Sequence, residues 1–218
     1  MIKTLLPTVA LTATAVVAVA PAHAGSTTYF GDLNPWTNLA GSYSYSTSDG
    51  VDIVATATSY DQANDVHHDS KVGKYLGGLG VTNSQSICFV NIDSHEVDGN
   101  GWQDTVWLDF SSAYELEKVT FSYVDRNDDV QIVDENHNVL AQLSIGSEPR
   151  FFGIASLDLS GLNISGTKIG FTAFDCDDNW KLKAIEGHAV PTPSAAAAGL
   201  LGLTALSARR RRNQQAAE

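Results

Sequence analysis

Short runs of apolar, β-branched and aromatic residues recur along this chain, and polar turns separate them about every 8–12 residues. Residues 51–60 (VDIVATATSY) and 116–124 (LEKVTFSYV) alternate apolar with polar positions, the period of a half-buried strand. No segment between residues 25 and 190 sustains a helical period. Further strands are expected at residues 43–45, 86–92, 105–110, 130–133, 139–145, 151–159, 168–174 and 182–190.

This pattern predicts an all-β fold, an antiparallel β-sandwich of jelly-roll type, with a closed barrel as the alternative. The segments between the expected strands are rich in polar residues and glycine. We expect polar loops at residues 61–74, which include His67 and His68, and at residues 93–104. Residues 77–81 (GGLGV) are expected to form a glycine-rich turn.

The N-terminus has the features of a signal peptide. Lys3 is followed by an apolar run over residues 5–20, and Ala22-His23-Ala24 is a small-x-small cleavage site. We therefore expect residues 1–24 to be removed and the mature protein to begin at Gly25. A retained membrane anchor is the alternative.

The C-terminus combines three features in a fixed order. Pro191, Thr192 and Pro193 precede an uncharged, Ala- and Leu-rich run over residues 194–208, and four arginines follow. As a helix the run would span about 22 Å, short of the ~30 Å hydrocarbon core of a bilayer. The arginines are expected to stay in the cytoplasm. The order predicts a processing signal, with a tail anchor or an Ala-rich core helix as the alternatives.

This arrangement resembles the PEP-CTERM sorting signal, which exosortase-type enzymes process in bacteria. Thr192 stands where that signal has glutamate, between the two prolines. The resemblance implies export, transient anchoring in the inner membrane by the apolar helix, and delivery to the cell surface or extracellular matrix. The implied sorting motif is Pro191, Thr192, Pro193, Arg209, Arg210, Arg211 and Arg212. The expected organisation is a signal peptide at 1–24, a β-sandwich domain at 25–189, a sorting signal at 190–212 and a tail at 213–218.

The net charge of the chain restricts the classes of molecule that it can bind. The whole chain has a formal net charge of −12, and five of its 13 basic residues lie in the two terminal segments. The body between them keeps 8 basic and 24 acidic residues, a formal charge of −16. Such a surface repels phosphate backbones, so nucleic acid is excluded as a partner, whereas divalent cations are favoured.

The body also resembles exosortase-dependent surface proteins. The resemblance lies in GGLGV, SHEVDG, TVWLDFS and VTFSYVDRNDD, between residues 77 and 129. It implies a secreted β-sandwich and brings no catalytic residues.

Acidic runs are the best candidates for chemistry. Asp125-x-Asn127-x-Asp129 and Asp175-x-Asp177-x-Asn179 place oxygen ligands at alternate positions, as the start of a calcium loop does. Neither run is an EF-hand, because Val130 and Trp180 stand where glycine is required. Simple turn formation by Asp and Asn is the alternative. The expected calcium ligands are Asp93, Glu96, Asp98, Asp104, Asp125, Asn127 and Asp129.

Two cysteines and three tryptophans complete the candidates. In an oxidising compartment Cys88 and Cys176 are expected to form a disulfide, with two buried thiols as the alternative. Trp107 lies in an apolar run and is expected in the core. Exposed tryptophans in polar segments could stack on sugar rings, or could instead seal the rim of the sandwich: Trp36, Trp102 and Trp180.

Taken together, the sequence predicts a non-enzymatic exported protein whose partners are signal peptidase and an exosortase-type enzyme. Calcium and extracellular polysaccharide are candidate ligands. A secreted carbohydrate-binding module is the alternative, and a glycoside hydrolase is a weaker one, because no GxSxG, HExxH or P-loop motif is present. The scattered histidines give no zinc signature.

Overall fold

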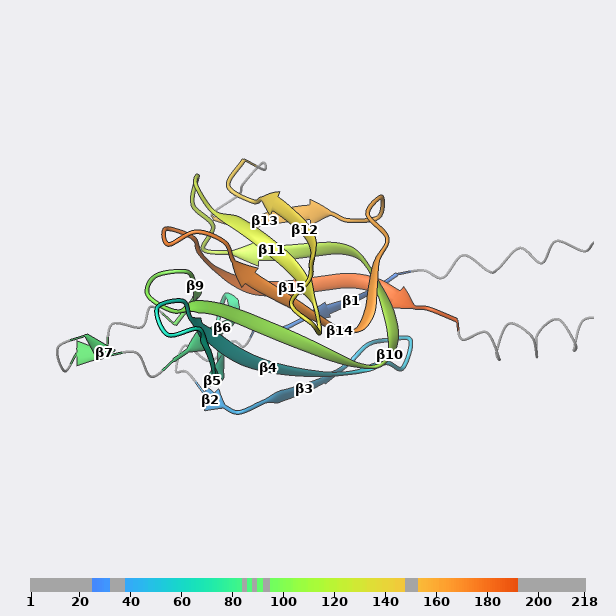
Figure 1. The fold of residues 1–218 in the computed structure, drawn as a ribbon. Helices are drawn as coiled ribbons and strands as arrows, with labels where there is room; N and C mark the ends of the chain where they lie inside the picture. The colour runs from blue at the N-terminus through green and yellow to red at the C-terminus, as the bar shows by residue number, and fades with distance from the viewer. Residues whose placement is uncertain are drawn as a thin grey trace, which may run out of the picture. The chain divides into compact units, whose positions relative to one another are not determined.

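Every element that the computed structural model describes is a β-strand (Figure 1). The described residues are 25–31, 38–83, 86–87, 90–91, 95–147 and 153–191. The strands are β1 (Ser26–Tyr29), β2 (Asn38–Ala40), β3 (Tyr43–Ser46), β4 (Asp52–Asp61), β5 (Val66–Tyr75), β6 (Gly78–Thr82), β7 (Ser86–Ile87), β8 (Val90–Asn91), β9 (Val97–Asp98), β10 (Gln103–Ser122), β11 (Asp129–Asp134), β12 (Val139–Ser144), β13 (Ala155–Asp158), β14 (Ile164–Ala173) and β15 (Asn179–Ala189). The paired strands are antiparallel, so the predicted all-β, antiparallel class is confirmed.

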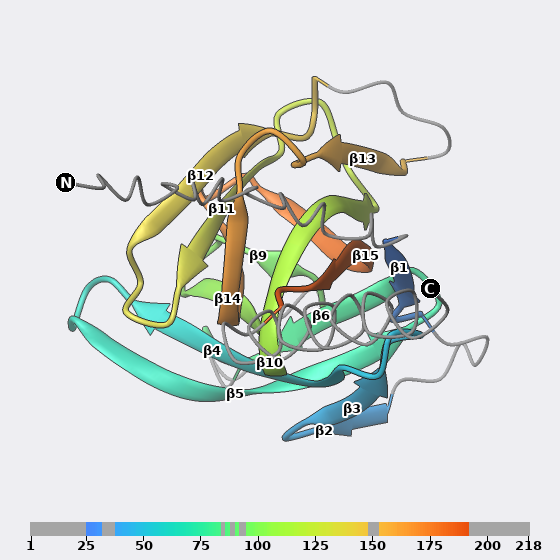
Figure 2. The ribbon, with the colours of Figure 1, turned by 90° about the vertical axis from the view of Figure 1, so that its right-hand side faces the viewer.

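Strand β10 is the centre of the fold. Its first half pairs with β4, from Gln103 to Phe110, and its second half pairs with β13 and β15. The register with β14 shifts between Asp109 and Tyr114, where the strand turns a corner (Figure 2). Residues 105–110 and 116–124 were expected to form two separate strands. They join because residues 111–113 (SSA) contain neither glycine nor proline, and a β-bulge lets one strand change direction without ending.

Strand pairing forms a closed circuit. β4 pairs with β10, β10 with β15, β15 with β6, β6 with β5, and β5 returns to β4. A branch leaves β10 through β14 and β11 and ends at β12. The last strand in sequence therefore lies between the first strand and the centre, with Ser26 opposite Gly187.

The core is built from the alternation that the sequence predicted. In β4 the inward positions are Ile53, Ala55 and Ala57, and each is buried. In β10, Val106 and Leu108 are completely buried. Each fully buried Val, Leu, Ile or Phe side chain contributes about 1.5–3 kcal/mol.

Two of the expected loops are strands instead. Residues 66–75 form β5, although residues 61–74 were predicted as a loop, because pairing with β4 sets Tyr60 opposite His67 and Ser59 opposite His68. The glycine-rich segment forms β6 and not only a turn. Gly80 permits this, because a Cβ there would lie 2.1 Å from the carbonyl oxygen of His95.

Residues 24–191 form one compact unit. In the described part of the chain, no helix is long and apolar enough to cross a membrane. The expected signal peptide and the expected apolar helix lie outside the described residues.

Candidate functional site

Two of the predicted acidic runs face each other at one end of the fold. Residues 123–128 connect β10 to β11, and residues 174–178 connect β14 to β15. They meet because β11 and β14 are neighbours in the sheet, with Val130 opposite Ala173. Across the junction, the side-chain amide of Asn127 donates to the carbonyl and the carboxylate of Asp177, at 3.2 and 2.8 Å.

The two turns are fastened by Asp128 and Asp178, which we call the aspartate clasp. Both side chains are buried, at 0% and 1% exposure. Asp128 accepts the N–H of Asp125 in its own turn at 2.5 Å and the N–H of Asn179 across the junction at 3.1 Å.

The second half of the clasp repeats this arrangement. Asp178 accepts the N–H of Asp175 in its own turn at 2.5 Å and the N–H of Asp129 across the junction at 2.7 Å. A third N–H, from Phe174, lies 2.8 Å away. Each carboxylate thus satisfies backbone donors of both turns, and charge-assisted bonds of this kind contribute about 1.5–3 kcal/mol each.

Burial is the largest cause of the pKa shifts of the two clasp aspartates. Burial raises the pKa of Asp128 to about 6, the N–H groups of Asp125 and Asn179 lower it, and the charges of Asp178 and Asp125 raise it further. The pKa of Asp178 is raised for the same first reason, against the donors from its two turns. The clasp therefore holds two carboxylates that resist being charged together.

A third acidic segment packs against the clasp. Gly99 donates its N–H to the carbonyl oxygen of Asp178 at 3.3 Å, and Asp98 lies opposite Asn179 in the β9–β15 pair. A Cβ on Gly99 would lie 2.1 Å from the carbonyl oxygen of Asp175, so only glycine allows this approach. Part of the predicted 93–104 loop thus joins the other two acidic runs.

The predicted calcium ligands of that loop are engaged in different contacts. Asp98 is buried and accepts the N–H of Asn100 at 3.1 Å. Glu96 forms an ion pair with Lys181 at 3.0 Å. Asp104 is held away in the core, where it accepts Ser59 Oγ and Asn83 Nδ2 at 2.5 and 3.1 Å. Asp93 lies outside the described residues.

At the facing turns, Asp125 and Asn127 are exposed and Asp129 is half-buried. Within the described ranges, no three or more His, Cys, Asp or Glu side chains are grouped so that they could hold a metal ion. Calcium binding here stays a prediction, and it requires the exposed carboxylates of the two turns to converge on the ion.

Neither residue of the clasp was predicted from the sequence. Asp128 and Asp178 occupy the fourth position of two similar pentapeptides, DRNDD and DCDDN. The predicted calcium ligands were instead at the first, third and fifth positions of these pentapeptides. The available signal was this repeated fourth-position aspartate, since Asp accepts backbone N–H groups within turns.

The tryptophans differ from one another. Trp180 was expected in a polar loop, either with a face open to a sugar or sealing the rim of the sandwich. It is completely buried at the start of β15, which rules out an open face, and its Nε1 donates to the carbonyl oxygen of Asp129 at 3.1 Å. Its ring is therefore part of the core beneath the clasp. Trp102 is half-buried and stacks on His68, with ring centroids 4.3 Å apart. Trp107 is buried as expected, and Trp36 lies outside the described residues.

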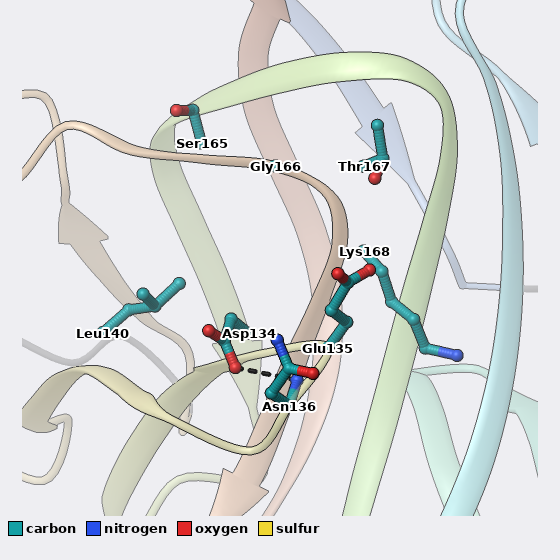
Figure 3. A pocket seen from close by; sticks show the side chains of 8 residues that line it. All are labelled: Asp134, Glu135, Asn136, Leu140, Ser165, Gly166, Thr167 and Lys168. Atoms are coloured by element: carbon teal, nitrogen blue, oxygen red, sulfur yellow. Dashed lines mark hydrogen bonds between the residues drawn. The ribbon is translucent and has the colours of Figure 1, made fainter.

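A hollow of about 260 Å³ lies beside the β11–β12 hairpin and β14 (Figure 3). Asp134 at its edge accepts bonds from the side chain and backbone of Asn138 and from the N–H of Asn136, and these lower its pKa. Lys168 extends away from Leu140 and Ser165 (Figure 3), and its ammonium pairs with Asp109 at 3.4 Å. Asp134 is thus held ionised, which does not suit a proton donor.

Cys176 is exposed in the turn between β14 and β15 and forms no disulfide with another described residue. Its expected partner, Cys88, lies outside the described residues, so the disulfide stays a prediction.

No protein-family model matches the chain, and no curated protein matches it.

Proposed function

We propose that this chain is a non-enzymatic exported protein of the cell surface or extracellular matrix, released from its C-terminal segment by an exosortase-type enzyme. Signal peptidase would remove residues 1–24. The apolar run at 194–208 would hold the precursor in the inner membrane only until sorting.

The observation that carries this proposal is where the β-domain ends. The last strand ends at Ala189, and the N–H of Val190 donates to the carbonyl oxygen of Ala113 at 2.8 Å. Pro191, the first residue of the sorting motif, follows at once. The compact unit thus closes at residue 191, which is what removal of a segment at this point requires.

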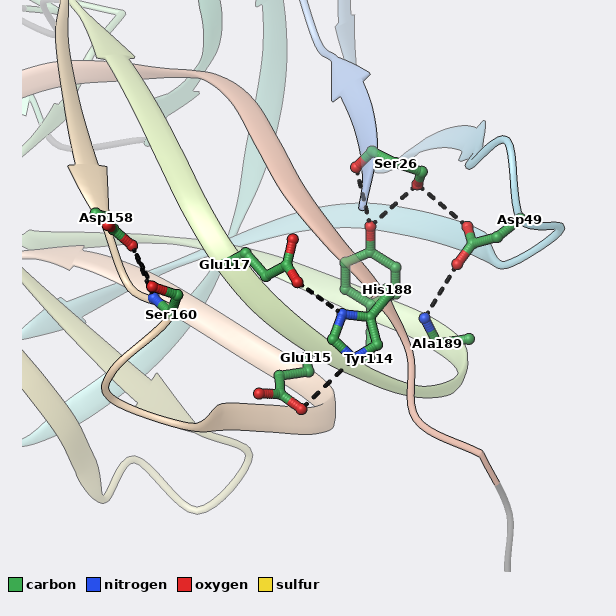
Figure 4. A network of polar contacts seen from close by, with 9 residues as sticks. All are labelled: Ser26, Asp49, Tyr114, Glu115, Glu117, Asp158, Ser160, His188 and Ala189. Atoms are coloured by element: carbon green, nitrogen blue, oxygen red, sulfur yellow. Dashed lines mark hydrogen bonds and ion pairs between the residues drawn. The ribbon is translucent and has the colours of Figure 1, made fainter. Parts of the chain in front are cut away.

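A polar network fixes this boundary to the beginning of the domain (Figure 4). Asp49 accepts Ser26 Oγ at 3.1 Å and the N–H of Ala189 at 3.0 Å, so one carboxylate joins β1 to the last residue of β15. Tyr114 reaches Ser26 from β10 at 3.2 Å. Both predicted processing points, before Gly25 and after Val190, therefore adjoin one hydrogen-bonded edge.

We further propose that the sheet is a jelly-roll sandwich in which β10 serves both layers. The bulge between Asp109 and Tyr114 supports this proposal, because strands that change sheets do so at bulges. A closed barrel is the alternative, and the closed pairing circuit favours it.

Intact mass of the protein recovered from the cell surface tests the proposal. We expect a product that begins near Gly25 and lacks Arg209–Arg212, and deleting the four arginines should impair sorting. A matched deletion of residues 213–218 leaves the motif and the arginines in place and should be sorted normally. A surface protein that retains the full tail would overturn the proposal.

Carbohydrate binding by the same domain is the second candidate function. It is favoured by a hollow of about 320 Å³ whose wall includes the half-exposed ring of Tyr123. We also propose a calcium ion at the facing turns 125–129 and 174–178. The convergence of predicted ligand runs supports it, and exposed, loosely arranged ligands fit the ~0.1–1 mM affinity of extracellular calcium modules.

A further inference from the structure

The hollow beside Tyr123 lies away from the residues that the sequence assigned to sugar binding. It is formed by the β5–β6 turn, the end of β10, the segment before β13 and the middle of β15. Its lining residues are Leu76, Gly77, Ser122, Tyr123, Ile154 and Lys183.

Tyr123 is held as a platform in the wall of this hollow. Its ring lies over the ammonium of Lys181, which is 4.0 Å from the ring centroid. That ammonium is buried and paired with Glu96 at 3.0 Å, so it supports the ring from a fixed position. Tyr123 is nevertheless 51% exposed, so about half of its surface remains accessible to a ligand.

The backbone is strained at the same residue. Tyr123 has a φ of 64°, a conformation that bulky side chains rarely adopt. The next residue is fixed by the bond from Val124 N to the carbonyl oxygen of Gly153, at 2.9 Å. Gly77 makes room for the ring, because a Cβ there would lie 2.4 Å from it. Strain of this kind persists where surrounding structure enforces it, and it is concentrated at ligand sites.

Polar groups border the aromatic wall. Lys183 lines the hollow and forms no ion pair with any residue in the described ranges, so its ammonium is available as a donor. Ser122 Oγ donates to the carbonyl oxygen of Gly77 at 2.7 Å and keeps capacity to accept. An aromatic face with a few hydrogen-bonding groups at its rim suits a ligand with an apolar face and a polar edge.

We propose that this hollow binds one neutral pyranose ring of an extracellular polysaccharide, stacked on Tyr123 and hydrogen-bonded by Lys183. The volume of about 320 Å³ is near the lower end for ligand pockets, which favours a single ring. A neutral sugar is favoured because the body carries −16, which repels acidic polymers as they approach, and among the described residues Lys183 is the one charged side chain that lines the hollow. The inference rests on the second candidate function and is independent of sorting.

Calorimetric titration of the full chain with cellotetraose, maltotetraose and galactotetraose tests the inference, with tetragalacturonate as the acidic comparison. We expect at least one neutral oligomer to bind. Tyr123→Ala and Lys183→Gln should each weaken it about tenfold or more, while Tyr123→Phe, which keeps the ring, should change it little. Lys118→Gln is the matched control, because Lys118 pairs with Glu186 on the surface and does not line the hollow.

Tyr123→Gly guards against loss of folding, because glycine adopts the left-handed backbone without strain and still removes the ring. Circular dichroism should show an intact β-domain that has lost binding. If neutral oligomers still bind both Tyr123→Ala and Lys183→Gln, the domain binds carbohydrate at another place, and the proposed site beside Tyr123 is wrong. No binding of any neutral oligomer would overturn both this site and carbohydrate binding by the domain, and tighter binding of tetragalacturonate would overturn the neutral assignment. None of these results bears on the mass of the sorted product.

Discussion

Neutralising one residue of the aspartate clasp should remove a pH dependence of stability that the clasp itself creates. The folded-state pKa of Asp128 is raised from 3.8 to about 6. A carboxyl group with a raised folded-state pKa favours folding when protonated. Its contribution is therefore fully present below the unfolded pKa and is lost as the pH rises through about 6.

The size of the effect follows from linkage. With these two pKa values, Asp128 alone makes the domain about 2 kcal/mol more stable at about pH 4.5 than at about pH 7. The raised pKa of Asp178 acts in the same direction. The lowered pKa values of Asp49, Asp61, Asp134 and Asp158 act in the opposite direction, but only below about pH 3.8, where these groups titrate. Burial and the charge of His67 lower the pKa of His137 from 6.5, and this also acts in the opposite direction, inside the pH interval considered. Asp128 and Asp178 should therefore lower the stability as the pH rises from about 4.5 to 7, and the part that Asp128 contributes is the part that its substitution removes.

The assay is urea unfolding of the full chain at the two pH values. Asp128→Asn should abolish the part of the difference that Asp128 contributes, because the amide does not titrate. At pH 7 the variant loses one acceptor for a backbone N–H, which lowers its stability, and loses the repulsion from Asp178, which raises it. The quantity to compare is therefore the change in unfolding free energy with pH, and not the stability at one pH. Asp69→Asn, which removes the charge of an exposed aspartate, is the control and should keep the slope. An Asp128→Asn variant whose stability changes with pH as the wild type's does would refute the reasoning, because His137, which acts in the opposite direction, is the same in both proteins.

Three other predictions concern calcium binding, the pairing of the two cysteines and the burial of two tryptophans. Calcium at a hundredfold excess over Kd should stabilise the domain by about 2.7 kcal/mol and raise the melting temperature by several degrees, more than Mg²⁺ does. Asp125→Ala should abolish that shift, whereas an equal response to NaCl at matched ionic strength would indicate general screening. Thiol labelling of unfolded, unreduced mature protein should find no free thiol if Cys88 and Cys176 are paired, and two free thiols would exclude the pairing. Trp180→Ala should cost about 3–5 kcal/mol in a denaturant titration and Trp102→Ala clearly less, because Trp180 is completely buried and Trp102 is not.

The strands that could be predicted are those whose own side chains alternate. Residues 51–60 gave the right position for β4 because Ile53, Ala55 and Ala57 all face the core. β5 could not be found this way, since it carries polar residues on both faces. His68 and Ser70 lie opposite Ser59 and Ala57 of β4, and this pairing makes a strand of a segment whose local pattern indicates a loop.

The candidate site was predictable in composition and not in geometry. The sequence marks both acidic turns, but their meeting depends on the pairing of β11 with β14, which no local pattern reveals. Likewise, the alternating spacing predicts Asp125 and Asp129 as calcium ligands, whereas in the structure Asp128 is the buried carboxylate that joins the two turns. Which carboxylate faces inward is decided by the backbone donors of the opposite turn, 49–51 residues away in sequence.

Strand β15 connects the aspartate clasp to the proposed sorting boundary. It begins at the clasp, where Asn179 N donates to Asp128, and it ends at the sorting boundary, where Ala189 N donates to Asp49. Its 11 residues span about 36 Å at ~3.3 Å each, several Debye lengths at physiological salt. Events at the tail should therefore leave the clasp unchanged. We expect the precursor and the sorted product to show the same change in stability between about pH 4.5 and 7 and the same response to calcium. A sorted product with a different pH slope would mean that the tail contacts the clasp, and the boundary after Val190 would then not separate the two.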